Sequence, residues 1–96
     1  MNSLPTIPLF PPGQIVATPG ALRMLEQAKK TPFEFLSRHL RGDWGDLGQE
    51  DETENELSLK HGYRLMSSYR IDGSETLWVI TEADRSATTM LLPSDY

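Results

Sequence analysis

Residues 63–71, Tyr-Arg-Leu-Met-Ser-Ser-Tyr-Arg-Ile, decide the fold of this chain. Mainly apolar and mainly polar side chains alternate along them, as is typical of a half-buried β-strand. Asp72-Gly73 follows at once, and Asp-Gly is a strong signal for a tight hairpin turn. Two further β-rich stretches, residues 76–82 and 87–92, lie downstream. The C-terminal third therefore predicts a three-stranded antiparallel meander.

Two pairs of residues upstream mark helix starts. Thr18-Pro19 and Thr31-Pro32 each combine a threonine N-cap with a proline at the first helical position, where its missing N–H costs nothing. Glu34 adds the acidic member of a capping box to the second start. We therefore expect helices over residues 19–30 and 32–41.

A third helix is expected over residues 49–61, ending at Gly62. Its first turns hold mainly Glu and Asp, which suit the positive end of the helix dipole. Its apolar face is poor, so we expect a surface helix with a large solvated side. Across the whole chain, apolar spacing predicts a core that includes Leu22, Leu25, Phe33, Leu36, Leu40, Leu65, Val79 and Leu91.

The first 13 residues form a separate region. They hold four prolines, which favour extended backbone, so we expect an arm rather than a helix. Residues 14–17 favour one short strand. The sequence therefore predicts an α+β fold: a proline-rich arm (1–13) and a single domain (14–96) in which two to three helices pack on the meander.

The composition excludes several classes of protein. The chain lacks cysteine, so neither disulfides nor thiolate metal sites reinforce it. No apolar run approaches the ~20 residues of a membrane span, and residues 1–5 do not resemble the start of a signal peptide. We therefore expect a cytoplasmic protein with no membrane association. A net charge of −5 also opposes direct binding to nucleic acid.

Charge is distributed unevenly along the chain. Residues 1–42 hold five basic and two acidic side chains, whereas residues 43–96 hold four basic and twelve acidic ones, seven of them within 43–56. This acidic block has three interpretations: a solvated helix face, a surface that docks on a basic protein, or an imitation of a phosphate array. If it binds, the candidate residues are Asp43, Trp44, Asp46, Glu50, Asp51, Glu52 and Glu54.

The loop at the start of the acidic block holds a tryptophan between two glycines, Gly42-Asp43-Trp44-Gly45. An exposed tryptophan would be an anchor of the kind that dominates interface energetics. Alternatively, Trp44 folds back to cover a thin core, because tryptophan is more often buried than exposed. The sequence leaves both alternatives open.

A second polar group lies on or beside the meander and consists of Arg64, Arg70, Arg85 and Thr88. Basic and aromatic groups on a sheet could serve RNA cleavage by attack of a 2′-hydroxyl. The order strand, helices, antiparallel strands also resembles the topology of RelE-type ribonuclease toxins. The acidic net charge opposes this function, since an enzyme that grips RNA is normally basic.

His39 and His61 are the only histidines, and they lack the four-residue spacing of a helical metal pair. We expect both at helix ends, facing solvent or a carbonyl group. The sequence therefore predicts no metal site and no cofactor.

Three segments, residues 17–22 (ATPGAL), 42–45 (GDWG) and 78–86 (WVITEADRS), resemble a group of short bacterial proteins encoded largely on plasmids and integrative elements. The resemblance carries no known activity, so no functional residue transfers. It implies the setting of a mobile genetic element, whose small accessory proteins often bind and block host proteins, including restriction and CRISPR machinery.

We therefore expect a non-enzymatic protein-binding module that contacts a basic surface of a host protein through the acidic helix and loop. An inhibitor of a host defence or nucleic-acid-handling protein is the specific form of this hypothesis. The alternative is a small RelE-like ribonuclease toxin acting from the meander face. The oligomeric state is left open.

Overall fold

The computed structural model describes residues 7–96. The elements are, in chain order, β1 (Gln14–Ala17), α1 (Pro19–Gln27), α2 (Pro32–Leu40), α3 (Gln49–His61), β2 (Leu65–Asp72), β3 (Glu75–Thr81), β4 (Ala87–Leu91) and the short 3₁₀ helix η1 (Pro93–Asp95). The predicted α+β class and all three predicted helices are thus present.

The sheet contains the predicted antiparallel meander of β2, β3 and β4, but it has a fourth strand. Its order is β1-β4-β3-β2, with β1 parallel to β4, so the predicted meander is three strands of a four-stranded mixed sheet. Parallel strands need a long crossover connection. Here that connection runs through all three helices and two other strands, so no local signal reveals the pairing.

The helix starts follow the predicted threonine caps. The hydroxyl of Thr18 accepts from the N–H of Ala21 at 3.1 Å, and that of Thr31 accepts from the N–H of Glu34 at 3.4 Å. The first helix ends at Gln27, before the predicted residue 30, because Lys29 adopts a left-handed backbone with φ of 60°. Gly62, also left-handed, ends α3 as predicted.

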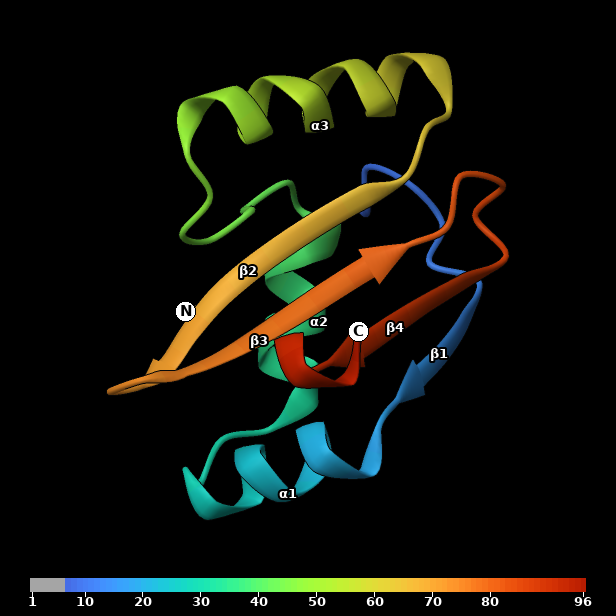
Figure 1. Cartoon of the computed structure of the whole chain (residues 1–96). Coiled ribbons are helices and arrows are strands. Elements are labelled where there is room, and N and C mark those ends of the chain that lie inside the picture. Colours follow the sequence, from blue (N-terminus) through green and yellow to red (C-terminus); the bar gives the residue numbers. More distant parts are fainter. Residues whose placement is uncertain (1–6) are drawn as a thin grey trace, which may run out of the picture.

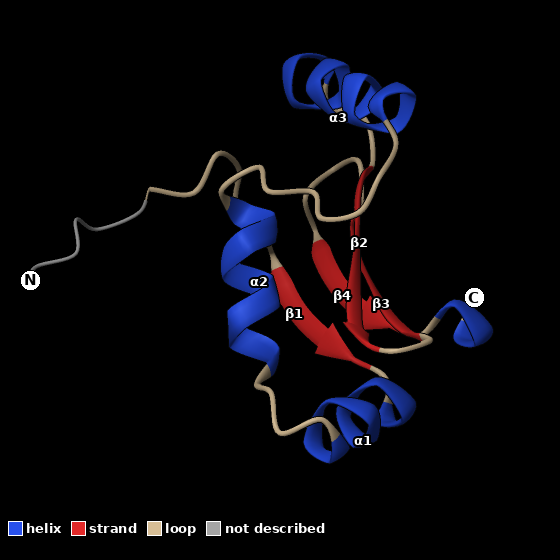
Figure 2. Cartoon of the chain, turned by 90° about the vertical axis from the view of Figure 1, so that its left-hand side faces the viewer, coloured by secondary structure: helices blue, strands red, loops and turns tan. Residues whose placement is uncertain are grey.

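The helices surround the sheet on both faces and at both ends. Helix α2 covers one face, with α1 at one end of the same face; η1 lies against the opposite face, and α3 lies across the other end beside β2 (Figures 1 and 2). The side chains that β2 turns toward α2, including Leu65 and Tyr69, are buried. None of the helices in residues 7–96 combines the length and apolar content that a membrane crossing requires.

The core agrees with the prediction at most positions. Of the eight predicted core residues, five are buried (Leu25, Leu36, Leu65, Val79 and Leu91) and Leu40 is half-buried. The prediction that Leu22 and Phe33 are buried is wrong, because their side chains are 45% and 72% exposed. In α1 and α2 the buried stripe only partly coincides with the predicted one: Leu25 and Leu36 belong to both, whereas Ala21 and Phe35 are buried in place of Leu22 and Phe33.

The described part of the proline-rich arm packs on the domain, whereas residues 1–6 of the predicted arm lie outside the described residues. The N–H of Leu9 donates to the carbonyl of Leu40 at 2.9 Å. Phe10 is buried and lies parallel to Trp44, with ring centroids 6.5 Å apart. The arm therefore covers the end of the core that faces α3.

Candidate functional site

Helix α3 is held to the domain by very few side chains. Asn55 and Ser58 are its only buried residues, and the rest of its surface faces solvent or is half-buried. Acidic residues in its first turn stabilise it through the helix dipole. At its other end, Arg85 caps the helix by donating to the carbonyl of Ser58 at 3.1 Å.

Asn55 attaches the middle of α3 to the edge of β2. Its side-chain N–H donates to the carbonyl of Met66 at 2.7 Å, and its side-chain oxygen accepts from the N–H of Met66 at 3.2 Å. A single amide side chain thus replaces the neighbouring strand that Met66 lacks on this side.

The loop before α3 pairs with the same edge. The N–H of Ser68 donates to the carbonyl of Trp44 at 3.1 Å, and the carbonyl of Ser68 accepts from the N–H of Asp46 at 2.6 Å. The Asp46 carboxylate accepts from the N–H of Arg70 at 2.7 Å. Gly45 has a φ of 78°, and a Cβ there would collide with the carbonyl of Ser68. Loop and Asn55 together close the free edge of β2.

Trp44 is buried, with 4% of its surface exposed, and this decides between the two alternatives left open by the sequence. Its ring lies 5.7 Å from that of His39, and its indole N–H donates to the Glu56 carboxylate at 3.3 Å. Trp44 is therefore a core residue that holds the loop in place, and it offers no exposed anchor to a partner.

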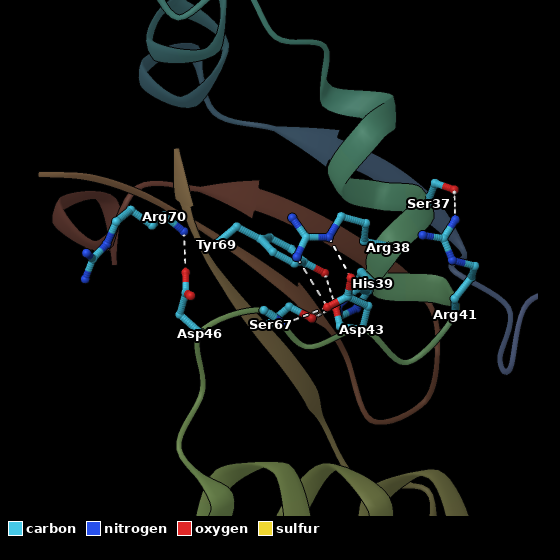
Figure 3. A network of polar contacts seen from close by, with 10 residues as sticks. Ser37, Arg38, His39, Arg41, Asp43, Asp46, Ser67, Tyr69 and Arg70 are labelled. Atoms are coloured by element: carbon cyan, nitrogen blue, oxygen red, sulfur yellow. Dashed lines mark hydrogen bonds and ion pairs between the residues drawn. The ribbon is translucent and has the colours of Figure 1, made fainter. Parts of the chain in front are cut away.

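Asp43 is engaged in the same loop. Arg38 donates to its carboxylate at 2.7 and 3.3 Å, and the guanidinium lies 4.6 Å from the centre of the Tyr69 ring (Figure 3). The hydrogen bond from Arg38 lowers the pKa of Asp43, with a further contribution from the N–H of Gly45. Burial raises the pKa of Tyr69 to about 12, and its hydroxyl donates to the carbonyl of Asp43 at 2.6 Å.

The seven predicted binding residues therefore separate into two groups. Asp43, Trp44 and Asp46 hold the loop against β2, whereas four acidic residues of α3 are exposed: Glu50, Asp51, Glu52 and Glu54. Within residues 7–96 the single ion pair is that of Arg38 with Asp43, so these four carboxylates have no ionic partner there.

Two apolar residues that sequence reasoning missed lie beside these carboxylates. Leu57 is 49% exposed and Tyr63 is 60% exposed. A shallow depression lined by Glu50, Thr53, Glu54 and Leu57 continues into a second one that adds Ser58, Tyr63 and Arg64. The alternation of residues 63–71 suggested an inward Tyr63, but β2 begins only at Leu65, after the turn at Gly62. We call Glu50, Thr53, Glu54, Leu57 and Tyr63 the α3 patch.

The four side chains of the alternative polar group point to different parts of the molecule. Arg64 donates to the hydroxyl of Tyr96 at 3.0 Å, while Arg85 donates to the carbonyls of Tyr63, Glu82, Ala83 and Ser58. Thr88 is buried and donates to the carbonyl of Pro12 at 2.7 Å. Arg70 is exposed at the edge strand. The structure thus does not bring these four side chains to one site.

His39 is fully buried, so the expectation that it faces solvent or a carbonyl is wrong. Its ring nitrogens contact the hydroxyls of Ser67 at 2.6 Å and Thr81 at 2.9 Å, and Thr81 contacts Thr88 at 2.7 Å. The carbonyl of Pro12 only accepts, so Thr88 donates to it, Thr81 donates to Thr88, and His39 donates from Nε2. The Ser67 hydroxyl then donates to Nδ1.

In this pair the Ser67 hydroxyl donates to the His39 ring, as a catalytic serine does to its general base, but both side chains lie inside the protein. Ser67 and His39 have no exposed surface. Burial, followed by the charge of Arg85, lowers the pKa of His39 to about 4, far from the range that suits a general base at neutral pH. The hydrogen-bonded chain therefore satisfies buried polar groups across β2, β3 and β4.

No grouping of His, Cys, Asp and Glu within residues 7–96 has the composition and geometry to hold a metal ion. Comparisons with known proteins add no assignment: no family matches the chain, and no similar curated protein or solved structure was found.

Proposed function

We propose that this chain is a non-enzymatic protein-binding module of a mobile element, acting in the cytoplasm, and that the α3 patch docks on a basic surface of a host protein. The outcome we propose for that docking is inhibition of a defence or nucleic-acid-handling protein. The proposal rests on one observation above all: α3 exposes four carboxylates that have no ionic partner within residues 7–96.

The way α3 is attached supports this proposal. Most helices in proteins are stabilised by packing an apolar face, yet α3 buries only Asn55 and Ser58. Hydrogen bonds at its middle and its end, together with Leu59 packed on the Trp44 cluster, hold α3 and leave most of its outer surface available to a partner.

The composition of the α3 patch is also suited to an interface. Leu57 and Tyr63 offer apolar surface, and tyrosine is enriched among residues that dominate binding energy. Glu50 and Glu54 lie on one side of them, one helical turn apart, about 6 Å along the axis. Carboxylates spaced in this way complement the Lys and Arg side chains of a cleft that binds phosphates, and they speed the encounter with it.

The proposal is tested by charge reversal at the α3 patch. The double variant Glu50→Lys/Glu54→Lys should lose capture of the host protein from a bacterial lysate, as identified by mass spectrometry. With the purified target, the variant should bind at least about tenfold more weakly, chiefly through slower association, because steering charges are removed. Association of the wild-type chain should also slow steeply with added salt.

The matched control is Asp72→Lys/Glu75→Lys, which makes the same change in net charge at the exposed tip of the β2–β3 hairpin. This variant should retain binding. If both double variants capture the same proteins with equal affinity, the acidic face of α3 serves only solvation and the proposal is wrong. Circular dichroism on each variant shows whether the helix content is retained.

A further inference from the structure

Within residues 7–96, the edge of the sheet formed by β1 is open. Its only strand neighbour there is β4, to which the N–H groups of Gln14 and Thr18 point, donating to Ser86 and Met90 at 3.0 Å each. Because successive residues of a strand direct their backbone groups to opposite sides, those of Ile15 and Ala17 point away from β4. In the part of the chain that the structure describes, they make no hydrogen bond outside the sheet.

The side chains along this edge are uncharged and partly apolar. Ile15 is 49% exposed and Val16 is 41% exposed, and residues 13–22 contain no charged side chain. Proteins commonly protect an edge strand with a lysine or a proline on the strand itself, and β1 has neither. The side chains of this edge therefore offer no charge that would repel an identical strand.

We propose that the strand that pairs here is β1 of a second copy of this chain, antiparallel across a two-fold axis at Val16. Such an axis places Ile15 opposite Ala17 of the second copy, and Ala17 opposite its Ile15. The outward N–H and C=O groups of these residues then form reciprocal hydrogen bonds. The two sheets become one continuous sheet of eight strands.

The distribution of charge favours a second copy at this edge. The acidic N-terminal end of α3 lies on the β2 side of the sheet, away from β1, whereas its C-terminal end reaches the β3–β4 turn, where Arg85 donates to Ser58 (Figure 1). In the dimer the two β2 strands are separated by seven strand spacings, roughly 33 Å. That exceeds the Debye length of about 8–10 Å at physiological salt. The acidic N-terminal turns of the two helices are therefore largely screened from one another, although each chain carries a net charge of −5.

The short strand predicts a weak, concentration-dependent dimer. Sedimentation equilibrium of the full chain from about 1 µM to about 1 mM, the range in which weak contacts form, should show a reversible monomer–dimer equilibrium. A wild-type chain that stays monomeric throughout this range would overturn the proposal.

The variant Ile15→Pro isolates the backbone contact. It removes the outward N–H of Ile15 while the N–H groups directed at β4 remain, and proline is tolerated on an edge strand in this orientation. Dimerisation should weaken by at least about tenfold, whereas equal dimerisation would contradict the proposal. If Ile15→Pro does not fold, Val16→Lys decides instead, because it places two lysines against each other at the two-fold axis.

Leu57→Lys is the matched control, since it introduces the same charge at an equally exposed apolar residue on α3. It should leave the dimer unchanged. The charge-reversed α3 variant Glu50→Lys/Glu54→Lys should also dimerise normally, so failure of the dimer and failure of the proposed function are distinguishable. An equal loss of dimerisation in Leu57→Lys and Val16→Lys would place the contact elsewhere and overturn the proposal.

Discussion

The two edges of the sheet are treated in opposite ways. On β2, the outward N–H groups of Met66, Ser68 and Arg70 each donate to the loop or to Asn55, so no strand can add there. On β1, the corresponding groups of Ile15 and Ala17 are without such partners among residues 7–96. An unpaired edge is a template for association with another chain. The difference therefore shows which side of this small domain can be extended.

The closed edge also explains how the acidic block is divided. Asp43, Trp44 and Asp46 belong to the loop that closes β2, and this loop leads directly into α3. Glu56 accepts from the indole N–H of Trp44, whereas Glu50, Asp51, Glu52 and Glu54 make none of these contacts and remain in solvent. One stretch of acidic sequence thus serves two purposes, closing an edge and exposing a charged helix.

Among substitutions at the closed edge, Trp44→Ala should cause the largest loss of unfolding free energy. Removing a buried aromatic side chain typically costs about 3–5 kcal/mol of unfolding free energy, and here it also releases the loop from β2. Urea unfolding followed by fluorescence and circular dichroism measures this loss. A midpoint equal to that of the wild-type chain would show that the ring is not part of the core.

The free energy of unfolding should depend on pH by up to about 3 kcal/mol through His39. The hydrogen-bonded chain of this residue extends from β2 to the arm before β1. Burial lowers its pKa from 6.5 to about 4, so the unfolded chain binds a proton that the folded chain does not. Stability should therefore be full above about pH 6.5 and fall as the pH drops from there to about 4.

Unfolding measured across this pH range tests the assignment. The variant His39→Gln should be less stable but should lose the pH dependence of this window, while His61→Gln should keep it. The lowered pKa of Asp43 adds a separate loss at more acidic pH, below about 3.8. Equal pH dependence in wild-type and His39→Gln proteins would exclude His39 as its source.

A smaller effect is expected from Asn55→Ala. It leaves the N–H and C=O of Met66 without their partner, and an unsatisfied buried group costs about 1–3 kcal/mol. The control is Thr53→Ala on the same helix, whose exposed hydroxyl bonds only to the carbonyl of Gln49. That change should alter the unfolding free energy by less than about 0.5 kcal/mol. Similar losses in both variants would mean that α3 does not close the edge.

Local signals allowed the helices and the hairpin to be predicted from sequence. Thr18, Thr31 and Gly62 act within one helical turn, and Asp72-Gly73 acts within one hairpin. Each of these residues determines backbone geometry at its own position. The meander and the exposed acidic helix followed from these signals and from the alternation of side chains.

Contacts between distant residues could not be predicted in the same way. The pairing of β1 with β4 joins residues about 70 positions apart, and the Trp44 ring is buried by Phe10 and His39. The burial of His39 has no local signal, because its polar partners, Ser67 and Thr81, come from two strands far along the chain. Tyr63 was missed because the turn at Gly62 removes it from the strand pattern.

Backbone hydrogen exchange tests the contrast between the two edges most directly. At low protein concentration the amides of Met66, Ser68 and Arg70 should exchange slowly, because each donates to the loop or to Asn55. The amides of Ile15 and Ala17 should exchange fast when dilute and become protected as the concentration rises and β1 pairs with a second copy. Fast exchange at Ser68, or slow exchange at Ile15 in dilute monomer, would contradict this account.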